Sequence, residues 1–374
     1  MIDRLPAPSR LVAAAVAVVA ALAGVAMLSP EPDRVTDRGA YEATAAMGIV
    51  PDCKDLHCFR VLVPWMLGSL PGASIVKWKG YAVAANAAAA AGVVALVLAW
   101  GLSLRAAVMA GALTAFGFGS LYTLHDPFTA DPLMYALAPL VLWLMLKERV
   151  AIGTAVGVIG VLAKEFVAAA LFISAADAAL AGRRDLAWRI LVGANLAVMA
   201  WLALQLTLIL RFNYGYDDNP STHLLSGGYL AAWLNQMSLQ SAAYALVGEF
   251  GALWLLAPAG VWLAPAALRR LLLVCAPVAA LFAYVQQPDR ALWNFHFIVT
   301  PLAALVLARV PGVIAWATIG LFVMANLRLG AQLSWVPSAA VPLALSFVMA
   351  LVAIAAVWLG AKNVSSAQLA EGRA

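Results

Sequence analysis

Short groups of charged residues interrupt a strongly apolar sequence, and they are the first candidates for chemistry. Asp33 and Asp37 lie four residues apart in a polar stretch that follows the first apolar run. An aspartate in such a position can act as a general base on the hydroxyl group of an acceptor. The alternative is that both are ordinary solvated loop charges, and the spacing alone favours that interpretation.

Arg60 lies at the start of an apolar piece, residues 59–70, that is too short to cross a membrane. Such a piece usually lies in the membrane interface or re-enters the membrane. The guanidinium of Arg60 could bind a lipid phosphate through two parallel hydrogen bonds. Equally, Arg60 could be an interfacial anchor, with Trp65 nearby in the aromatic belt.

The segment 125–132 combines polar side chains with a helix start. Asp131 has the character of a helix N-cap, with Pro132 at the first helical position, so we expect it to have a structural role. No comparable structural role explains the presence of His125 and Asp126, so both are candidate substrate contacts. The alternative for both is a solvated loop.

Two further groups contain cations. Lys164 and Glu165 are flanked by apolar residues on both sides, and ionisable groups at membrane depth are costly and usually functional. The alternative for this pair is a mutual ion pair at the tip of a helical hairpin. Arg290 follows Asp289 ahead of another apolar run, and it is a second candidate for binding a phosphate or pyrophosphate.

The composition indicates what positions these residues. The chain of 374 residues is 65% hydrophobic and 11% charged, with a mean hydropathy of +0.92. Soluble domains are about 45–50% apolar and about 25% charged. We therefore predict an all-α polytopic membrane protein forming one transmembrane domain, residues 1–374, with no soluble appendage. At about 20 residues per span, the length allows roughly 10–13 spans.

The charge and the motifs exclude several classes of function. A net charge of +5 is ordinary for a membrane protein with basic cytoplasmic loops, and no soluble basic cluster indicates a nucleic-acid partner. The sequence has no phosphate-binding glycine-rich loop, dinucleotide fingerprint or HExxH zinc helix. ATP and sugar-nucleotide chemistry therefore have no visible site.

Apolar runs predict about twelve transmembrane helices, with boundaries uncertain by several residues. They cover residues 11–28, 75–101, 105–122, 131–146, 151–163, 166–181, 187–210, 242–264, 271–285, 295–308, 312–327 and 338–360. The first outer loop, residues 30–74, contains the expected interfacial helix, and a second long outer loop covers residues 211–241. The run at 11–28 could be a signal peptide, but its length favours a retained first span with a cytoplasmic N-terminus.

The segments 151–163 and 166–181 could form one long helix or a hairpin of two short ones. The hairpin is favoured because it places the basic loop residues on one side, as the positive-inside tendency requires. These residues are Arg105, Lys147, Arg149, Arg183, Arg184, Arg189, Arg269, Arg270 and Arg309. The same topology places Lys164, Glu165 and most acidic residues at the outer boundary, and both termini in the cytoplasm.

Three cysteines add little chemistry. Cys53 and Cys58 share a polar loop, and a disulfide is plausible there if the loop faces an oxidising compartment. His57 between them suggests a metal site, but no fourth ligand stands nearby, so none is predicted. The outer carboxylates could hold a divalent metal, although no ligand pattern requires one. Cys275 lies in an apolar run and is interpreted as a core residue.

Five of these segments occur in a recognisable order. They are Asp37-x-x-x-Tyr41 after the first span, Arg60 to Pro64, Thr129 to Leu133 opening a span, Gly160 to Glu165 ending a short span, and Asp289-Arg290 before a span containing Pro301 to Ala304. In this order they resemble the GT-C class of glycosyltransferases, over about residues 11–310. These are polytopic membrane enzymes that typically use a polyprenyl-phosphate-linked sugar at the extracytoplasmic face.

The resemblance implies a GT-C-like fold and an inverting transfer of sugar to an envelope glycan, lipid or protein acceptor. It implies Asp37 as the catalytic residue, with Asp33 as its substitute; the class commonly has an adjacent acidic pair here. Lys164, Arg290 and Arg60 would neutralise the leaving lipid phosphate. The remaining candidate substrate contacts are Tyr41, His125, Asp126, Asp131 and Glu165. We expect a bacterial inner membrane location, in contact with membrane lipids.

Two other functions remain open from the sequence. One is a transporter or flippase for a lipid-linked or small polar substrate, and the other is a noncatalytic subunit of an envelope-assembly complex. Transporters commonly place substrate groups near the membrane midplane between symmetric halves. This sequence shows neither obvious halves nor a dense set of midplane charges, which favours chemistry at one membrane boundary.

Overall fold

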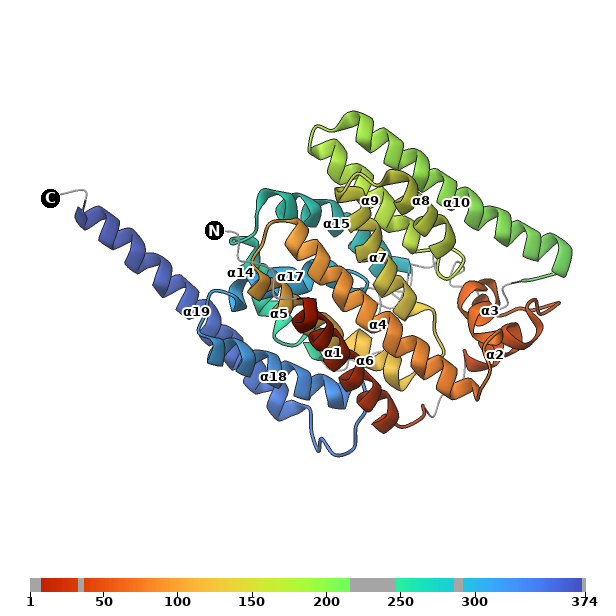
Figure 1. Cartoon of the computed structure of the whole chain (residues 1–374), viewed down its shortest axis with the longest axis horizontal. Coiled ribbons are helices and arrows are strands. Elements are labelled where there is room, and N and C mark those ends of the chain that lie inside the picture. The colour runs from red at the N-terminus through yellow and green to blue at the C-terminus, as the bar shows by residue number, and fades with distance from the viewer. Residues whose placement is uncertain (1–7, 33–36, 216–246, 286–291, 372–374) are drawn as a thin grey trace.

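The structure is a computed structural model that describes residues 8–32, 37–215, 247–285 and 292–371. The described residues are helical, with a helix content of 78% and no strands, as Figure 1 shows. This confirms the predicted all-α class. The predicted second outer loop, residues 211–241, falls almost wholly outside the described residues.

Long apolar helices make up the body of the protein. Within the described residues, five are long and apolar enough to cross a membrane. They are α4 (Ser74–Ala99), the consecutive pair α5 (Leu104–Ala115) and α6 (Phe118–His125), α10 (Arg184–Phe212), α18 (Gly312–Leu329) and residues 340–360 of α19 (Ala340–Glu371). The chain is therefore a membrane-embedded helical protein, and the count of twelve spans stays a prediction.

Seven further helices complete the described part of the bundle. They are α1 (Pro8–Leu28), α7 (Asp131–Leu146), α8 (Val150–Gly160), α9 (Val167–Leu180), α14 (Leu253–Val261), α15 (Ala266–Val285) and α17 (His296–Leu307). Most of them match a predicted apolar run within a few residues. The reason is that lipid offers no hydrogen-bond partners, so an apolar run in a membrane has to satisfy its own backbone N–H and C=O groups by forming a helix.

One predicted span is broken in two. Residues 105–122 form α5 and α6, which are separated at Gly117. A Cβ atom at Gly117 would lie 1.9 Å from the ring of Trp293, and one at Gly119 would lie 2.0 Å from the same ring. The buried indole of Trp293 therefore occupies the space of two missing side chains, and the packing of α17 against α5 depends on both glycines.

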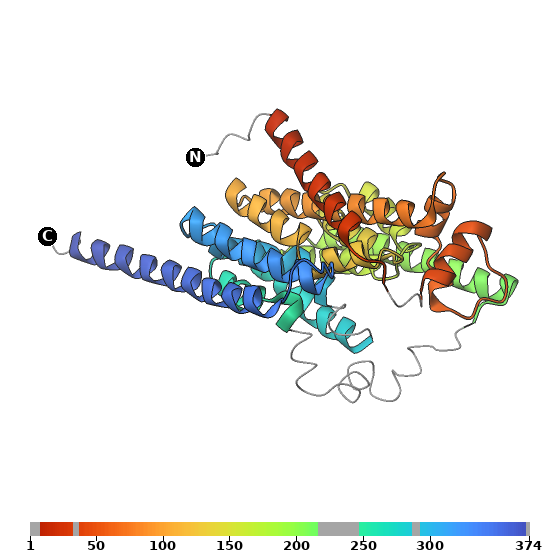
Figure 2. The ribbon, with the colours of Figure 1, turned by 90° about the horizontal axis from the view of Figure 1, so that it is seen from below.

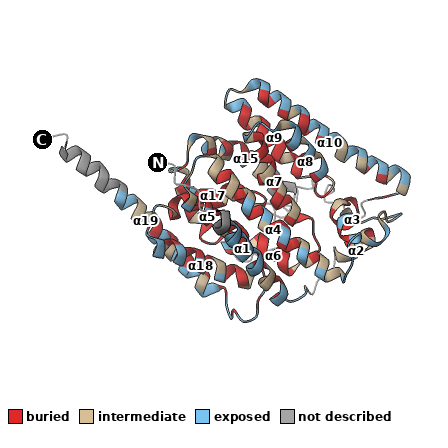
Figure 3. Cartoon of the chain, in the orientation of Figure 1, coloured by how far each residue is buried: buried red, intermediate tan, exposed pale blue. Residues whose placement is uncertain are grey.

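The outer face of α10 is apolar and exposed. Its exposed large side chains recur every three or four residues, so they share one face of the helix. Figure 3 colours much of α10 as exposed. They are Trp188, Val192, Leu196, Met199, Leu202, Leu206 and Leu210. A soluble monomer rarely exposes an apolar stripe of this size, whereas a lipid-facing helix requires one.

The chain reverses direction between α8 and α9. The turn after α8 brings Lys164 to Asp131, at the start of α7. Asp177, near the end of α9, lines a cavity together with Met145, near the end of α7. Hence α8 runs antiparallel to both of its neighbours, which confirms the hairpin in place of a single long helix.

Because of this reversal, the basic loop residues lie at one end of the bundle. The loops that join α4 to α5, α7 to α8, α9 to α10 and α17 to α18 lie at one end, where Arg105 donates to the Val310 carbonyl and Arg270 contacts Asp177. The basic residues predicted for cytoplasmic loops gather there. In Figure 2 the first turns of α1 and the last turns of α19 point away from the opposite end, where α2 and α3 lie. The side of the membrane that each end faces stays a prediction.

A small helical cap covers the other end of the bundle. It consists of α2 (Arg38–Met47), the 3-10 helix η1 (Leu56–Phe59) and α3 (Leu62–Gly68). Gly68 lets α3 cross α2 closely, because a Cβ atom there would lie 2.1 Å from the Ala45 carbonyl oxygen. A short helix is thus present where the interfacial helix is expected, but it begins three residues later and ends two residues earlier than residues 59–70. Its position at the membrane interface stays a prediction.

The cap is tied to the end of α10. The Asp52 N–H donates to the Phe212 carbonyl at 2.9 Å, and the Gly215 N–H donates to the Cys53 carbonyl at 3.0 Å. Cys53 and Cys58 form a disulfide within the cap, which the sequence had allowed, and Cys275 is buried in the core. These contacts hold the loop in place together with an apolar cluster that includes Phe59, Leu208 and Tyr214.

Candidate functional site

A cluster of polar side chains lies where the cap meets the bundle. We call it the Tyr41 cluster, after the residue nearest its centre. Its members come from the start of α2, η1, the start of α7 and the α8–α9 turn. They are Asp37, Tyr41, Asp55, His57, Arg60, Asp131, Lys164 and Glu165.

His57 lies between two carboxylates. Asp55 accepts the backbone N–H of His57 at 2.8 Å and lies 2.7 Å from its Nδ1, so one carboxylate fixes both the turn and the ring. The other ring nitrogen, Nε2, lies 3.2 Å from Oδ2 of Asp37. A neutral imidazole donates from one nitrogen only. When a neutral ring donates from Nδ1 to Asp55, its Nε2 carries no proton and faces the Asp37 carboxylate.

Asp55 is held in its ionised form. Burial by itself would raise the pKa of Asp55, but the hydrogen bonds from the side chain and backbone of His57 outweigh it and leave the pKa below its ordinary value. Asp37 occupies the N-cap position of α2 but makes no capping hydrogen bond with its side chain. Its carboxylate is thus directed to His57 and not to the helix backbone.

Arg60 pairs with Glu165 across the junction of cap and bundle. The guanidinium donates to Oε1 of Glu165 at 3.0 Å. Burial would raise the pKa of Glu165, but the positive charges of Arg60 and Lys164 hold it below its ordinary value. Burial by itself would lower the pKa of Arg60, but Glu165, Tyr41 and Asp131 outweigh it and raise the pKa above its ordinary value. Both side chains of the pair are therefore charged.

Lys164 and Asp131 form a second ion pair, and both side chains are almost fully buried. This corrects two interpretations of the sequence. Asp131 is the first residue of α7 and not its N-cap, which is Ala130, because its carboxylate neutralises the buried ammonium instead. Lys164 and Glu165 do not pair with each other, because adjacent residues in the turn point toward different partners.

Tyr41 is fully buried at the centre of the cluster. The centroid of its ring lies 5.5 Å from that of the His57 ring, in an edge-to-face arrangement, and 5.3 Å from that of the Trp78 ring. Burial is the main cause that raises the pKa of Tyr41 to about 12; the nearby Arg60 partly offsets this, and the carboxylates of Asp131 and Asp37 add to it. Tyr41 is therefore a neutral phenol at physiological pH, placed between the catalytic candidate and both ion pairs.

The structure places the other sequence candidates elsewhere. The Nδ1 atom of His125 lies 2.8 Å from the carbonyl oxygen of Pro30, to which it can donate, and the His125 ring packs against Tyr122. These contacts join α6 to the segment after α1, which is a structural role. Asp126 caps the end of α6, where its backbone N–H donates to the Tyr122 carbonyl. Asp33 and Arg290 lie outside the described residues.

Sequence reasoning missed the roles of Asp55 and His57. His57 was considered only as a metal ligand, and in the part of the chain that the structure describes no group of three or more His, Cys, Asp or Glu residues is arranged to hold a metal ion. The available signal was the Asp-x-His spacing, in which an aspartate can cap a short turn and orient the imidazole two residues later.

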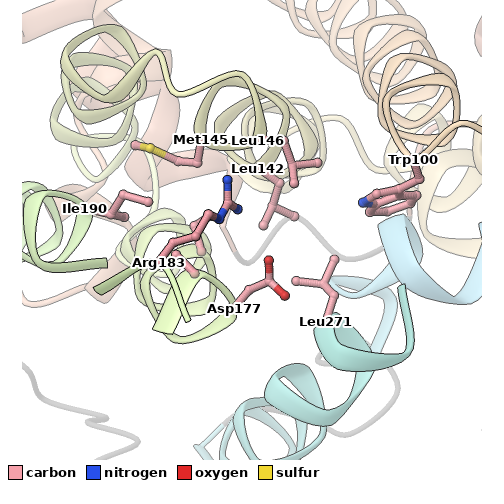
Figure 4. Close-up of a pocket in the computed structure, with 10 residues that line it drawn as sticks. Trp100, Leu142, Met145, Leu146, Asp177, Arg183, Ile190 and Leu271 are labelled. Atoms are coloured by element: carbon pink, nitrogen blue, oxygen red, sulfur yellow. The ribbon is translucent and has the colours of Figure 1, made fainter. Parts of the chain in front are cut away.

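A second buried carboxylate lies at the opposite end of the bundle. Asp177 accepts hydrogen bonds from Arg270 at 2.7 and 3.4 Å. Figure 4 shows Asp177 and Arg183 beside a cavity that is otherwise lined mainly by apolar side chains. The cavity has about 20 Å³ of accessible volume, which is enough for a water molecule and too little for a sugar. The Tyr41 cluster, which brings together eight ionisable side chains, is the stronger candidate site.

The comparisons with known proteins do not assign the chain to a family. No protein-family model matches it, and a search of curated proteins finds no significant match. The functional conclusion therefore depends on the cluster itself.

Proposed function

We propose that this protein is a membrane glycosyltransferase that moves a sugar from a polyprenyl-phosphate donor to an acceptor hydroxyl at the extracytoplasmic face of its membrane. The observation that carries the proposal is the chain Asp37–His57–Asp55 beside the guanidinium of Arg60. It combines a base, a route for its proton and a cation within one cluster. The acceptor class is a glycan, a lipid or a protein of the cell envelope.

In the proposed reaction Asp37 acts as the general base. The acceptor oxygen attacks the anomeric carbon, the bond from that carbon to the phosphate oxygen breaks, and the phosphate leaves with the electron pair. The acceptor proton moves to the ionised carboxylate of Asp37 and can pass from there to Nε2 of a neutral His57, whose Nδ1 donates to Asp55. Asp55 stabilises the resulting imidazolium, as an orienting carboxylate does in other acid–base chains.

Arg60 is the proposed contact for the phosphate. A guanidinium has five N–H donors, and one hydrogen bond to Glu165 leaves the others for a ligand. Its Nε is buried and makes no hydrogen bond of ordinary geometry within the described residues, and neither does the Tyr41 hydroxyl beside it. Tyr41 is fully buried and does not reach the surface, whereas the Arg60 side chain is 12% exposed and can donate to phosphate oxygens that gain negative charge as the bond to the sugar breaks.

Lys164 has a different proposed role. Its ammonium is only 1% exposed and pairs with Asp131, so it does not reach the surface. We assign it to positioning: it neutralises Asp131, which would otherwise compete with the phosphate for Arg60. Asp131 and Glu165 then set the net charge of the cluster without contacting the substrate.

The test is sugar transfer by the purified protein in lipid. The assay offers a panel of labelled polyprenyl-phosphate sugars and a mixed acceptor extract from cell envelopes. Asp37→Asn should lower transfer at least about a hundredfold, the size expected for loss of a general base. Glu42→Gln is the matched control, because Glu42 belongs to the same helix and contacts Arg38 instead of the cluster.

Each outcome has a distinct meaning. Transfer that Asp37→Asn leaves unchanged would keep the activity and reject the proposed base. Absence of transfer by a folded wild-type protein with every donor would reject the activity and favour transport of a lipid-linked substrate. In that case, movement of the labelled donor across vesicles is the measurement to make next.

A further inference from the structure

A groove of about 670 Å³ lies between α9, α10 and α15, and its charged end is at the basic end of the bundle, away from the Tyr41 cluster. Its lining contains the small residues Ala175, Ala176, Ala179 and Ala187. Larger side chains form the rest of the lining, among them Phe172 and Leu191. The volume lies within the range of about 300–1,000 Å³ that is typical of ligand sites.

The groove is open to its surroundings and nearly all apolar. Phe172 is 37% exposed and Trp188 is 67% exposed, although both line it. In a membrane the medium beside such a groove is lipid, and an extended acyl chain matches an apolar channel of this shape. The eight residues from Phe172 to Ala179 span about 10 Å at a rise of 1.5 Å per residue, so the groove accommodates part of one chain.

Arg184 supplies a charge at one end of the groove. It is the first residue of α10, it is exposed, and it shares one face of the helix with Ala187, Trp188 and Leu191. Asp185 is its neighbour in sequence but projects about 100° further around the helix. Tryptophan and arginine beside an apolar groove are the residues that proteins place at the level of lipid headgroups.

The other arginines near this end already have partners. Arg183 contacts Glu148 at 3.4 Å, and Arg270 contacts Asp177. Within the described residues, no carboxylate lies within ion-pair distance of Arg184. Its guanidinium therefore has its full set of donors available for a phosphate.

We propose that this groove binds one anionic glycerophospholipid of the surrounding leaflet. The acyl chain lies along the alanines of α9 and α10, and the phosphate accepts hydrogen bonds from Arg184 at the membrane boundary. Basic pockets between transmembrane helices commonly bind anionic headgroups in this way. The site is separate from the Tyr41 cluster, so it does not depend on the proposed activity.

The experiment is native mass spectrometry of the full chain, delipidated in detergent and titrated with phosphatidylglycerol or phosphatidylcholine of identical acyl chains. The wild type should prefer phosphatidylglycerol, and Arg184→Ala should weaken its binding about tenfold. Arg189→Ala is the matched control: Arg189 is an exposed arginine of the same helix but not part of the groove. It should leave binding unchanged.

Two results would overturn the proposal. Equal weakening by Arg184→Ala and Arg189→Ala would mean diffuse attraction to surface charge, and equal binding of the two lipids would remove the role of the phosphate. A second measurement tests the acyl chain. Phosphatidylglycerol with brominated chains should quench more fluorescence in the wild type than in Trp188→Phe, because Trp188 lines the groove, and equal quenching would also overturn the proposal.

Discussion

Nε2 of His57 lies 3.2 Å from Oδ2 of Asp37, while Nδ1 of the same ring faces Asp55 at 2.7 Å. The first carboxylate comes from the start of α2, and the second comes from the turn that opens η1. This arrangement makes the ionisation of Asp55 and the orientation of the imidazole interdependent. It also gives the first prediction.

Asp55→Asn should destabilise the cap in a pH-dependent manner. The pKa of Asp55 is held below its ordinary value of 3.8, so its ionised form stabilises the folded state above about pH 3.8. That stabilisation is lost as the pH falls through the lower, folded-state pKa. Melting temperatures of wild type and variant in detergent should therefore differ at neutral pH and converge in acid. A difference that grows below about pH 3.8 would contradict this account, and Glu42→Gln is the control.

The buried pair of Lys164 and Asp131 should behave non-additively. Replacing one partner, as in Lys164→Met or Asp131→Leu, leaves an uncompensated buried charge and should cost about 3–5 kcal/mol of unfolding free energy. The double variant removes both charges and should cost much less than the sum. Unfolding of the four proteins by denaturant in mixed micelles measures this cycle. Additive losses would mean that the two side chains do not interact in the folded protein.

Loss of the disulfide should loosen the cap and leave the bundle intact. Cys53 and Cys58 close a loop of about six residues, for which chain-entropy estimates give about 2 kcal/mol. The variant Cys53→Ser/Cys58→Ser should increase hydrogen exchange of residues 50–60, with no change in α4 or α10. Because this loop holds His57, sugar transfer should fall as well. Exchange that rises equally throughout the bundle would show that the cap is not a separate unit.

The predicted sidedness can be tested with two exposed loop positions. Ser334 lies between α18 and α19 at the same end as the cap, and Lys147 lies at the basic end. The native cysteines give little background, since two are in the disulfide and the third is buried. In intact cells a membrane-impermeant thiol reagent should label Ser334→Cys and not Lys147→Cys. The reverse pattern would place the Tyr41 cluster in the cytoplasm and reject a donor at the outer face.

Much of the fold could be predicted from composition and local pattern. An apolar run in lipid has to satisfy its own backbone polar groups, so the sequence by itself determined that the chain is helical and where most helices lie. The distribution of arginines also indicated the reversal at Lys164 and Glu165, because only a hairpin keeps the basic loops together. The break at Gly117 was not predictable, since it depends on Trp293, which is distant in sequence.

The candidate site was only partly predictable for the same reason. Residue types indicated Asp37, Arg60 and Lys164, since ionisable groups in an apolar chain are conspicuous. Only the tertiary structure decided that Asp131 neutralises Lys164, that Glu165 pairs with Arg60, and that His125 contacts Pro30 instead of the cluster. Charge pairing acts across distances of a few ångströms in space, and sequence position does not determine which helix ends meet.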